Sequence, residues 1–173
     1  MTVQESKLKQ NGIIKLDGYH IFKTHGAGMG GGLLTAVRHE LEPTLIYQCE
    51  DDCEIMVVQI KLGSRNIRIF NAYGPQELDV SAQTKYNFWQ NLEKQVISAF
   101  EADCDIVIEL DANAKVGSSI LENDPNSQSE NGKLMMEMLE RQNLHLVNAS
   151  SLCKGTITRH RVAAGRTEKS VLD

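Results

Sequence analysis

The run Asp105-Ile-Val-Ile-Glu-Leu-Asp-Ala-Asn113 joins an apolar segment to two polar side chains at its carboxyl end. The short apolar segment Asp105–Leu110 is predicted to be a buried strand. Because side chains alternate along a strand, Asp111 and Asn113 are expected to face the same way. A carboxylate beside an amide can position a water nucleophile and stabilise developing negative charge. An Asx turn that ends a buried strand is the purely structural alternative.

Before this run, the sequence predicts a series of short strands separated by turns. They are rich in β-branched and aromatic residues and lie at Tyr19–Phe22, Gly32–Val37, Thr44–Tyr47, Ile55–Ile60 and Asn66–Asn71. Gly63–Arg65 is a predicted hairpin turn. The cluster Gly26–Gly32 contains the pattern GxGxxG, but a strand pattern follows it instead of a helix. A hairpin turn is therefore favoured over a nucleotide-binding loop.

The period becomes helical from Thr84 to about Ala102, and a second helix is predicted with Asn131 as its cap. Leu134, Met135, Met138 and Leu139 are expected on the buried face of this second helix. Further strands are predicted at Leu144–Val147, Gly155–Thr158 and Lys169–Asp173. Strands followed by a helix–strand–helix–strand order indicate layers of helices around central sheets.

The composition indicates one globular domain. The chain has 173 residues, 41% of them hydrophobic, and a net charge of −5, so a strongly basic nucleic-acid-binding surface is not indicated for the whole molecule. The four cysteines lack zinc-ligand spacing and are predicted to be free thiols. Without a signal peptide or a long apolar run, the protein is expected to be soluble and intracellular, nuclear or cytoplasmic. A basic cluster near the C-terminus is either a phosphate-binding patch or a solvated loop; it comprises Lys154, Arg159, His160, Arg161, Arg166 and Lys169.

Two further motifs are weak when taken singly. Asn71-Ala-Tyr-Gly-Pro75 ends an apolar strand with a tyrosine in a sharp turn, where its hydroxyl can bind a phosphate oxygen or simply pack. Gln4-Glu5-Ser6 is otherwise read as a solvated terminal segment. In combination, the order Gln-Glu, Asn-x-Tyr-x-Pro, Asp-x-Asn-Ala and Ser-x-x-Asp closely resembles the endonuclease/exonuclease/phosphatase superfamily.

This resemblance implies a role for each matching residue. Glu5 corresponds to the glutamate that binds Mg²⁺, with Mn²⁺ as an alternative ion. Tyr73 corresponds to the tyrosine that contacts the scissile phosphate, and Asp111 and Asn113 to the residues that activate water and stabilise the transition state. Asp173 corresponds to the aspartate that orients a catalytic histidine.

Within the superfamily, the sequence is most similar to the endonuclease domains of non-LTR retrotransposons. The run Gly155-Thr-Ile-Thr-Arg159 resembles those sequences, and Asn71, Thr156 and Arg159 are candidates for phosphate contacts. The resemblance implies a DNase I-like α/β sandwich, with two mainly antiparallel sheets flanked by helices in four layers. It also implies DNA as a partner and a reverse transcriptase domain in the parent polyprotein.

The sequence also departs from the family pattern. Leu110 stands where the family usually has glycine, and an early strand with a catalytic asparagine and a late Ser-Asp-His are missing from residues 1–173. We therefore expect an incomplete domain with weak or no activity, because general acid–base assistance contributes about 10²–10⁴-fold in rate. The alternatives are a phosphatase or sphingomyelinase-like hydrolase of the same superfamily, and a non-catalytic remnant that binds DNA or protein.

Overall fold

The computed structural model describes residues 1–8, 12–25, 31–49, 53–78, 80–117, 127–147, 150, 159–163 and 166–170, with side chains described as far as residue 150. The elements are β1 (Thr2–Val3), β2 (Tyr19–Lys23), β3 (Leu34–Arg38), η1 (His39–Leu41), β4 (Thr44–Gln48), β5 (Glu54–Leu62), β6 (Arg65–Tyr73), α1 (Ala82–Glu101), β7 (Asp105–Asp111), α2 (Glu130–Arg141), β8 (Arg159–Ala163) and β9 (Arg166–Ser170).

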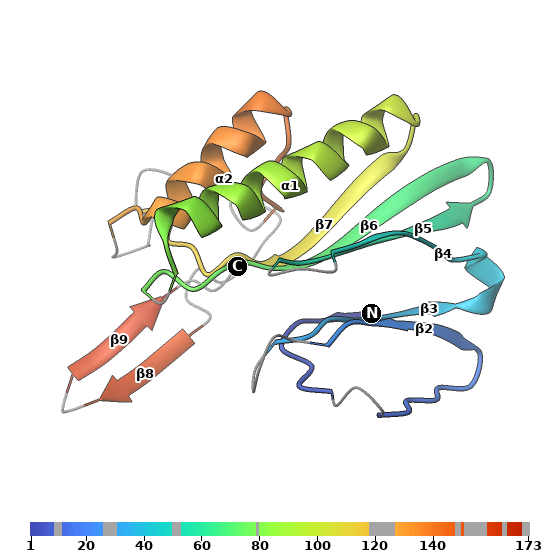
Figure 1. Cartoon of the computed structure of the whole chain (residues 1–173), viewed down its shortest axis with the longest axis horizontal. Coiled ribbons are helices and arrows are strands. Elements are labelled where there is room, and N and C mark those ends of the chain that lie inside the picture. The colour runs from blue at the N-terminus through green and yellow to red at the C-terminus, as the bar shows by residue number, and fades with distance from the viewer. Residues whose placement is uncertain are drawn as a thin grey trace. The chain divides into compact units, whose positions relative to one another are not determined.

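The chain divides into two compact units. Unit 1 comprises Met1–Tyr73 and Asn91–Leu110, and unit 2 comprises Gly74–Gln90 and Asp111–Asp173. Three described sheets have the strand orders β1-β3-β2, β4-β5-β6-β7 and β8-β9 (Figure 1). Strand β3 pairs antiparallel with β1 and β2, and β5 pairs antiparallel with β4 and β6.

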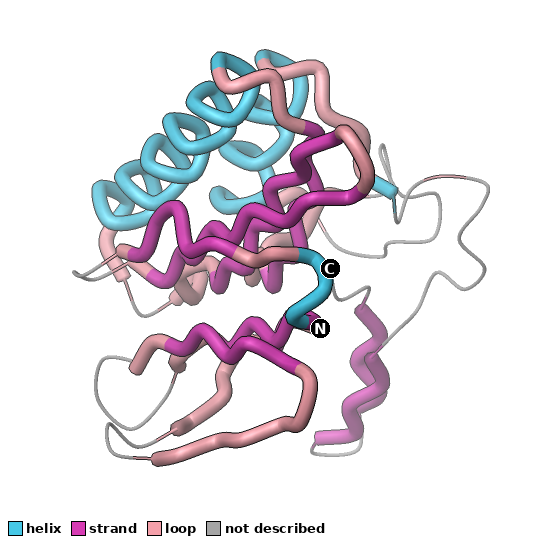
Figure 2. The backbone as a smooth tube through the Cα atoms, turned by 90° about the vertical axis from the view of Figure 1, so that its right-hand side faces the viewer, coloured by secondary structure: helices cyan, strands magenta, loops and turns pink. Residues whose placement is uncertain are grey.

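The first two sheets enclose the apolar core of unit 1. A buried cluster joins the two sheets: Leu33, just before β3, and Val37 of β3 pack with Met56, Val58 and Ile60 of β5. Each such side chain contributes about 1.5–3 kcal/mol when it is fully buried. The two sheets therefore pack face to face, as Figure 2 shows for the strands drawn in magenta.

Helix α1 covers the opposite face of the sheet that contains β6. In the part of α1 that belongs to unit 1, Leu92, Val96 and Ala99 are fully buried. Arg68 of β6 donates a hydrogen bond to the Ser98 hydroxyl at 3.2 Å, which fixes the helix over this face. The predicted α/β fold with two mainly antiparallel sheets is confirmed.

The strand predictions between residues 19 and 71 correspond to β2–β6, and their bounds differ by only a few residues. The strand predicted at Asp105–Leu110 is confirmed as β7, but the prediction that it is buried is wrong, because β7 ends the strand order of its sheet and Val107 is 46% exposed. The strand predicted at Leu144–Val147 is also absent. Its first residue instead closes the end of α2, since the Leu144 N–H donates to Leu139 O at 2.9 Å.

The cysteine prediction is corrected as well. Cys49 and Cys53 form a disulfide, with their Cα atoms 5.9 Å apart. They flank the connection between β4 and β5, whose antiparallel pairing brings the two chain segments together. Cys104 is a free, buried thiol, and Cys153 lies outside the described residues. In the part of the chain that the model describes, no helix combines the length and apolar character needed to cross a membrane.

Candidate active site

In unit 1 the structure brings together two of the residues singled out in the sequence. Glu5 lies just after β1 and Tyr73 ends β6, 68 positions later in the chain. The Tyr73 hydroxyl donates a hydrogen bond to Glu5 Oε1 at 3.1 Å. The Glu5 carboxylate is exposed and the tyrosine is half-buried, so a charged ligand can approach both groups from solvent.

The backbone of Glu5 has an unusual conformation. Its φ is 49°, in the left-handed region that costs an L-residue roughly 1–2 kcal/mol. The two following peptide groups are fixed, because the Ser6 N–H donates to Gly32 O and the Lys7 N–H to Gly31 O, both at 2.9 Å. Unfavourable backbone conformations that the surrounding structure maintains in this way cluster at functional sites.

Asn71, predicted to contact phosphate, is fully buried in unit 1. Its Oδ1 accepts a hydrogen bond from Gln4 Nε2 at 2.8 Å, and its Nδ2 donates to Leu34 O at 2.9 Å and to Thr35 Oγ1 at 3.1 Å. The amide thus links β6 to β3 and to the residue that precedes Glu5. A phosphate contact by Asn71 stays a prediction.

Glu54 belongs to the same neighbourhood, although sequence reasoning missed it. Its Oε2 accepts a hydrogen bond from the Gly32 N–H at 2.8 Å. Glu54 also lies opposite Tyr73 in the antiparallel register of β5 and β6. Burial is the main cause that raises the pKa of Glu54, the Gly32 N–H opposes it, and the negative charge of Glu5 raises the pKa further. A single acidic residue at the start of a strand gives no sequence signal of this proximity.

These residues can be tested for their fit to Mg²⁺. Within the described residues, no group of three or more His, Cys, Asp or Glu side chains is placed to hold a metal ion. Mg²⁺ does not need such a group, since it usually binds one or two carboxylates and completes its octahedron with water and substrate phosphates. Glu5 offers an exposed carboxylate. Beside it, Ser6 Oγ is buried without a hydrogen-bond partner among the described atoms, and buried polar atoms of this kind usually bind water or an ion. The donor set fits a hydrated Mg²⁺.

In unit 2, Asp111 and Asn113 form a tight turn at the end of β7. The Asn113 N–H donates to Asp111 Oδ1 at 3.2 Å, which is an Asx turn. Asn113 also has a φ of 47°. The expectation that strand alternation orients both side chains is therefore wrong, because the strand ends at Asp111 and the chain then turns. Both residues remain half-buried, so neither is sealed from solvent.

The Gly-Pro turn that follows Tyr73 is bonded directly to this turn. The Gly74 N–H donates to Asp111 O at 2.7 Å, and Asn113 Nδ2 donates to Gly74 O at 2.8 Å. A Cβ atom added to Gly74 would lie 2.4 Å from Ala112 O, well inside ordinary contact distance. Only glycine permits the two backbone segments to approach so closely.

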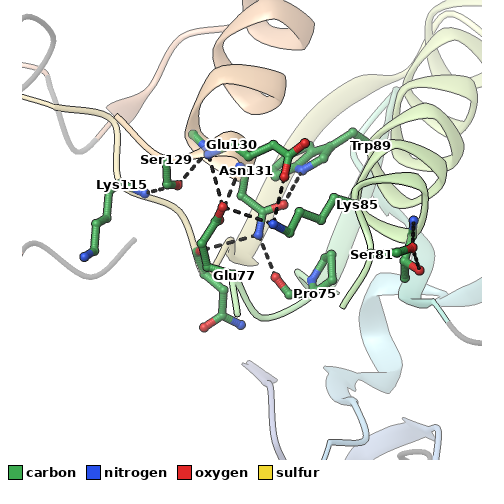
Figure 3. Close-up of polar contacts among 12 residues, drawn as sticks. Pro75, Glu77, Ser81, Lys85, Trp89, Lys115, Ser129, Glu130 and Asn131 are labelled. Carbon is green, nitrogen blue, oxygen red and sulfur yellow. Dashed lines mark hydrogen bonds and ion pairs between the residues drawn. The ribbon is translucent and has the colours of Figure 1, made fainter. Parts of the chain in front are cut away.

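A buried polar network supports the same turn (Figure 3). Asn131 is fully buried and its Nδ2 donates to Pro75 O at 2.6 Å and to Asn113 O at 3.3 Å. Its Oδ1 accepts the Trp89 Nε1–H at 3.0 Å. The prediction that Asn131 caps the second helix is wrong; Ser129 is the N-cap, and its side chain accepts the Gly132 N–H.

Three charged side chains complete the network of unit 2. Lys85 Nζ, on a side chain only 6% exposed, donates to Glu130 Oε2 at 2.9 Å and to Glu77 Oε1 at 3.1 Å. The bond to Glu130 is the main reason that the pKa of Lys85 is raised. Burial alone raises the pKa of Glu77, but hydrogen bonds from Lys85 and from the N–H groups of Asn131 and Glu130 lower it below its usual range.

The remaining predicted site residues cannot be placed in this geometry. Thr156 and Asp173 lie outside the described residues, and Arg159 begins β8 with its side chain outside the description. The basic cluster near the C-terminus falls largely on β8 and β9, which form an antiparallel hairpin.

Several solved structures resemble the chain in fold. The endonuclease domain of TRAS1, a telomere-specific non-LTR retrotransposon, matches with a TM-score of 0.62 and 18% identity, covering 91% of this chain and 65% of that chain. The 3′ phosphatase NExo from Neisseria, bound to a product DNA hairpin, gives a TM-score of 0.57 and 15% identity over 80% of this chain and 59% of that chain. An AP endonuclease from Archaeoglobus fulgidus gives a TM-score of 0.56 and 17% identity, covering 81% of this chain and 59% of that chain.

The chain therefore spans less than two thirds of the length of these three proteins. No protein-family model matches the sequence, and no curated protein matches it.

Proposed function

Because the chain has the DNase I-like fold expected of the endonuclease/exonuclease/phosphatase superfamily, we propose that it hydrolyses phosphodiester bonds of DNA with the help of Mg²⁺. The observation that supports this proposal best is the hydrogen bond between Tyr73 and Glu5. The resemblance assigns one of these residues to the metal and the other to the phosphate, and direct contact between them agrees with a shared role.

The residues of unit 1 would bind the metal and the substrate. Glu5 would hold the ion through its exposed carboxylate, and a bound Mg²⁺ would supply charge neutralisation at the phosphoryl group. The Tyr73 hydroxyl donates a hydrogen bond to Glu5 Oε1 in this structure, which orients the carboxylate. The same hydroxyl would donate to a phosphate oxygen when substrate is bound.

The resemblance assigns the activation of water and the stabilisation of developing charge to residues of unit 2. Asp111 accepts the proton of the attacking water, and the Asn113 N–H bonded to Oδ1 fixes the orientation of its carboxylate. The Asn113 side chain donates to Gly74 O, and its amide would donate to a phosphoryl oxygen in the transition state. Loss of one such donor costs about 10²–10³-fold in rate.

Nicking of supercoiled plasmid DNA in the presence of Mg²⁺ tests the proposal. Glu5→Gln and Asp111→Asn should each lower the nicking rate by about 10²-fold or more, because each removes a charge that the chemistry requires. Glu42→Gln is a matched control, since Glu42 is also exposed and also has a positive φ of 46°. Equal nicking by Glu5→Gln and the control protein would refute the proposed role of Glu5.

The same proposal extends to the longer protein from which this chain would come. The TRAS1 likeness supports an endonuclease of a retrotransposon-type polyprotein, in which a nicked strand primes reverse transcription. A coding sequence for a reverse transcriptase downstream of this chain is the expected finding. A protein-coding sequence without one would contradict this part of the proposal.

A second candidate is removal of 3′ phosphates, because one of the similar structures is a 3′ phosphatase. An oligonucleotide with a 3′ phosphate separates the two activities: release of inorganic phosphate without plasmid nicking favours the phosphatase. DNA binding that is unchanged by Glu5→Gln, with neither activity present, favours a non-catalytic binding module.

A further inference from the structure

We infer that Glu54 is a positioning residue that holds the backbone around Glu5 in the conformation needed for binding a divalent cation. The inference rests on the proposed role of Glu5 as a metal ligand. It adds a residue that none of the sequence motifs contains.

The carboxylate of Glu54 fits against two glycines at the start of β3. Its Oε2 accepts the Gly32 N–H at 2.8 Å. A Cβ atom on Gly31 would lie 1.9 Å from Glu54 Oε1, so the missing side chain is what makes room for the carboxylate. Both glycines are buried and have positive φ values of 81° and 86°, which L-residues with side chains rarely adopt.

The same two glycines hold the segment that follows Glu5. Gly32 O accepts the Ser6 N–H, and Gly31 O accepts the Lys7 N–H, both at 2.9 Å. The Glu54 carboxylate, the glycine pair and the backbone after Glu5 therefore form one continuous series of hydrogen bonds. Through this series, the position of the Glu54 carboxylate sets the position of the Ser6 and Lys7 peptide groups.

This support matters because Glu5 adopts a conformation that it would otherwise avoid. Its φ of 49° is disfavoured for a glutamate, and the N–H groups of the two residues after it both donate to the glycine pair. If the pair moves, Glu5 can relax to a favoured backbone conformation, and its carboxylate then leaves Tyr73. Groups that orient a metal ligand without touching the metal typically change metal affinity by about 10–100-fold when removed.

The burial of Glu54 agrees with a structural requirement for this group. Its carboxylate is half-buried beside a second negative charge, an environment that costs free energy for an unpaired acid. A neutral side chain of similar shape would avoid that cost. Glutamine at this position also keeps an oxygen that can accept the Gly32 N–H, which makes Glu54→Gln the informative conservative variant.

Two measurements on the whole chain test the inference. The first is amide hydrogen exchange at Ser6 and Lys7 without metal, in wild type, Glu54→Ala, Glu54→Gln and the control Glu42→Ala. The second is the affinity for Mn²⁺, measured by electron paramagnetic resonance, of the same proteins and of Glu5→Gln.

We expect Glu54→Ala to speed exchange of both amides severalfold and to weaken Mn²⁺ binding by about 10-fold or more. Glu54→Gln should stay within about 3-fold of wild type in both measurements, because it preserves the acceptor. Unchanged exchange in Glu54→Ala would overturn the inference. Equal loss of Mn²⁺ affinity in the Ala and Gln variants would overturn it too, since the charge would then matter and not the hydrogen bond.

Failure of the proposed function gives a different pattern. In that case Glu5→Gln binds Mn²⁺ as wild type does, or wild type does not bind it. The exchange measurement still decides whether Glu54 holds the backbone beside Glu5.

Discussion

Replacing Gly74 by alanine is expected to lower the free energy of unfolding by about 2–4 kcal/mol. The new Cβ would lie 2.4 Å from Ala112 O, whereas ordinary contacts begin at 3.4 Å, so the two backbone segments must separate by about 1 Å. The neighbouring atom belongs to the backbone and cannot rotate away. Overpacking of this kind costs about 1–3 kcal/mol.

The separation also strains the hydrogen bonds that join the two segments. The Gly74 N–H and Asp111 O are 2.7 Å apart, and Gly74 O accepts Asn113 Nδ2 at 2.8 Å. A shift of about 1 Å breaks at least one of these bonds, and a lost hydrogen bond adds about 0.5–1.5 kcal/mol. For a chain of 173 residues, the combined loss corresponds to a fall in Tm of roughly 5–15 °C.

Urea unfolding followed by circular dichroism and by tryptophan fluorescence measures this loss. Trp89 is the single tryptophan and belongs to unit 2, as Gly74 does, so its emission reports on the affected unit. Gly63→Ala is the control, because Gly63 has a positive φ of 64° but open space around its Cβ position. Its expected cost is about 1 kcal/mol, from backbone conformation alone. A Gly74→Ala protein as stable as the Gly63→Ala protein would refute the reasoning.

Three further changes have expected outcomes that follow from the structure. Ser129→Ala removes the N-cap that accepts the Gly132 N–H and should cost about 1 kcal/mol in urea unfolding, with no loss contradicting the cap assignment. The pKa of Glu77 is lowered in the folded state, so its ionised carboxylate stabilises the fold at neutral pH. This stabilisation is lost as pH falls through the acidic range below the ordinary pKa of glutamate. Glu77→Gln should therefore reduce the difference in the free energy of unfolding between pH 7 and pH 4. Thiol titration of the denatured chain should reveal two more reactive thiols after reduction than before, and this difference should vanish in the double variant Cys49→Ser/Cys53→Ser. Opening that short loop should cost about 2 kcal/mol.

The sequence predicted the elements of this fold well where a periodic pattern determines them. The antiparallel strands β5 and β6 and the long helix α1 each have a strong repeat of apolar residues, and the tight turn between the two strands has glycine. Burial was harder to predict, because it depends on neighbours that the pattern does not specify. Strand β7 has a fully apolar centre, yet Val107 is 46% exposed because β7 ends its sheet.

The residue types of the candidate site were predictable, but their roles in packing were not. Asn131 was expected at a helix cap, where asparagine is common, and instead it is fully buried with its amide bonded to Trp89 and to two backbone carbonyls. Those partners come from segments far apart in the sequence. Glu54 is a parallel case in unit 1, since its contact with Gly32 joins two different sheets, whose packing no local pattern encodes.

Both candidate residues that follow strands, Glu5 and Asn113, have positive φ values, of 49° and 47°. Asparagine tolerates the left-handed region, and the side chain of Asp111 stabilises the Asn113 conformation locally through an Asx turn. Glutamate has no such tolerance, and in the described part of the chain neither the Gln4 nor the Ser6 side chain makes a comparable bond to the Glu5 backbone. Its conformation must be maintained from a distance, by the carbonyls of Gly31 and Gly32 and, behind them, by Glu54. The proposed metal-binding role of Glu5 therefore comes from a motif, whereas the inferred support for its geometry comes from a glutamate that lies 49 positions further along the chain and belongs to no motif.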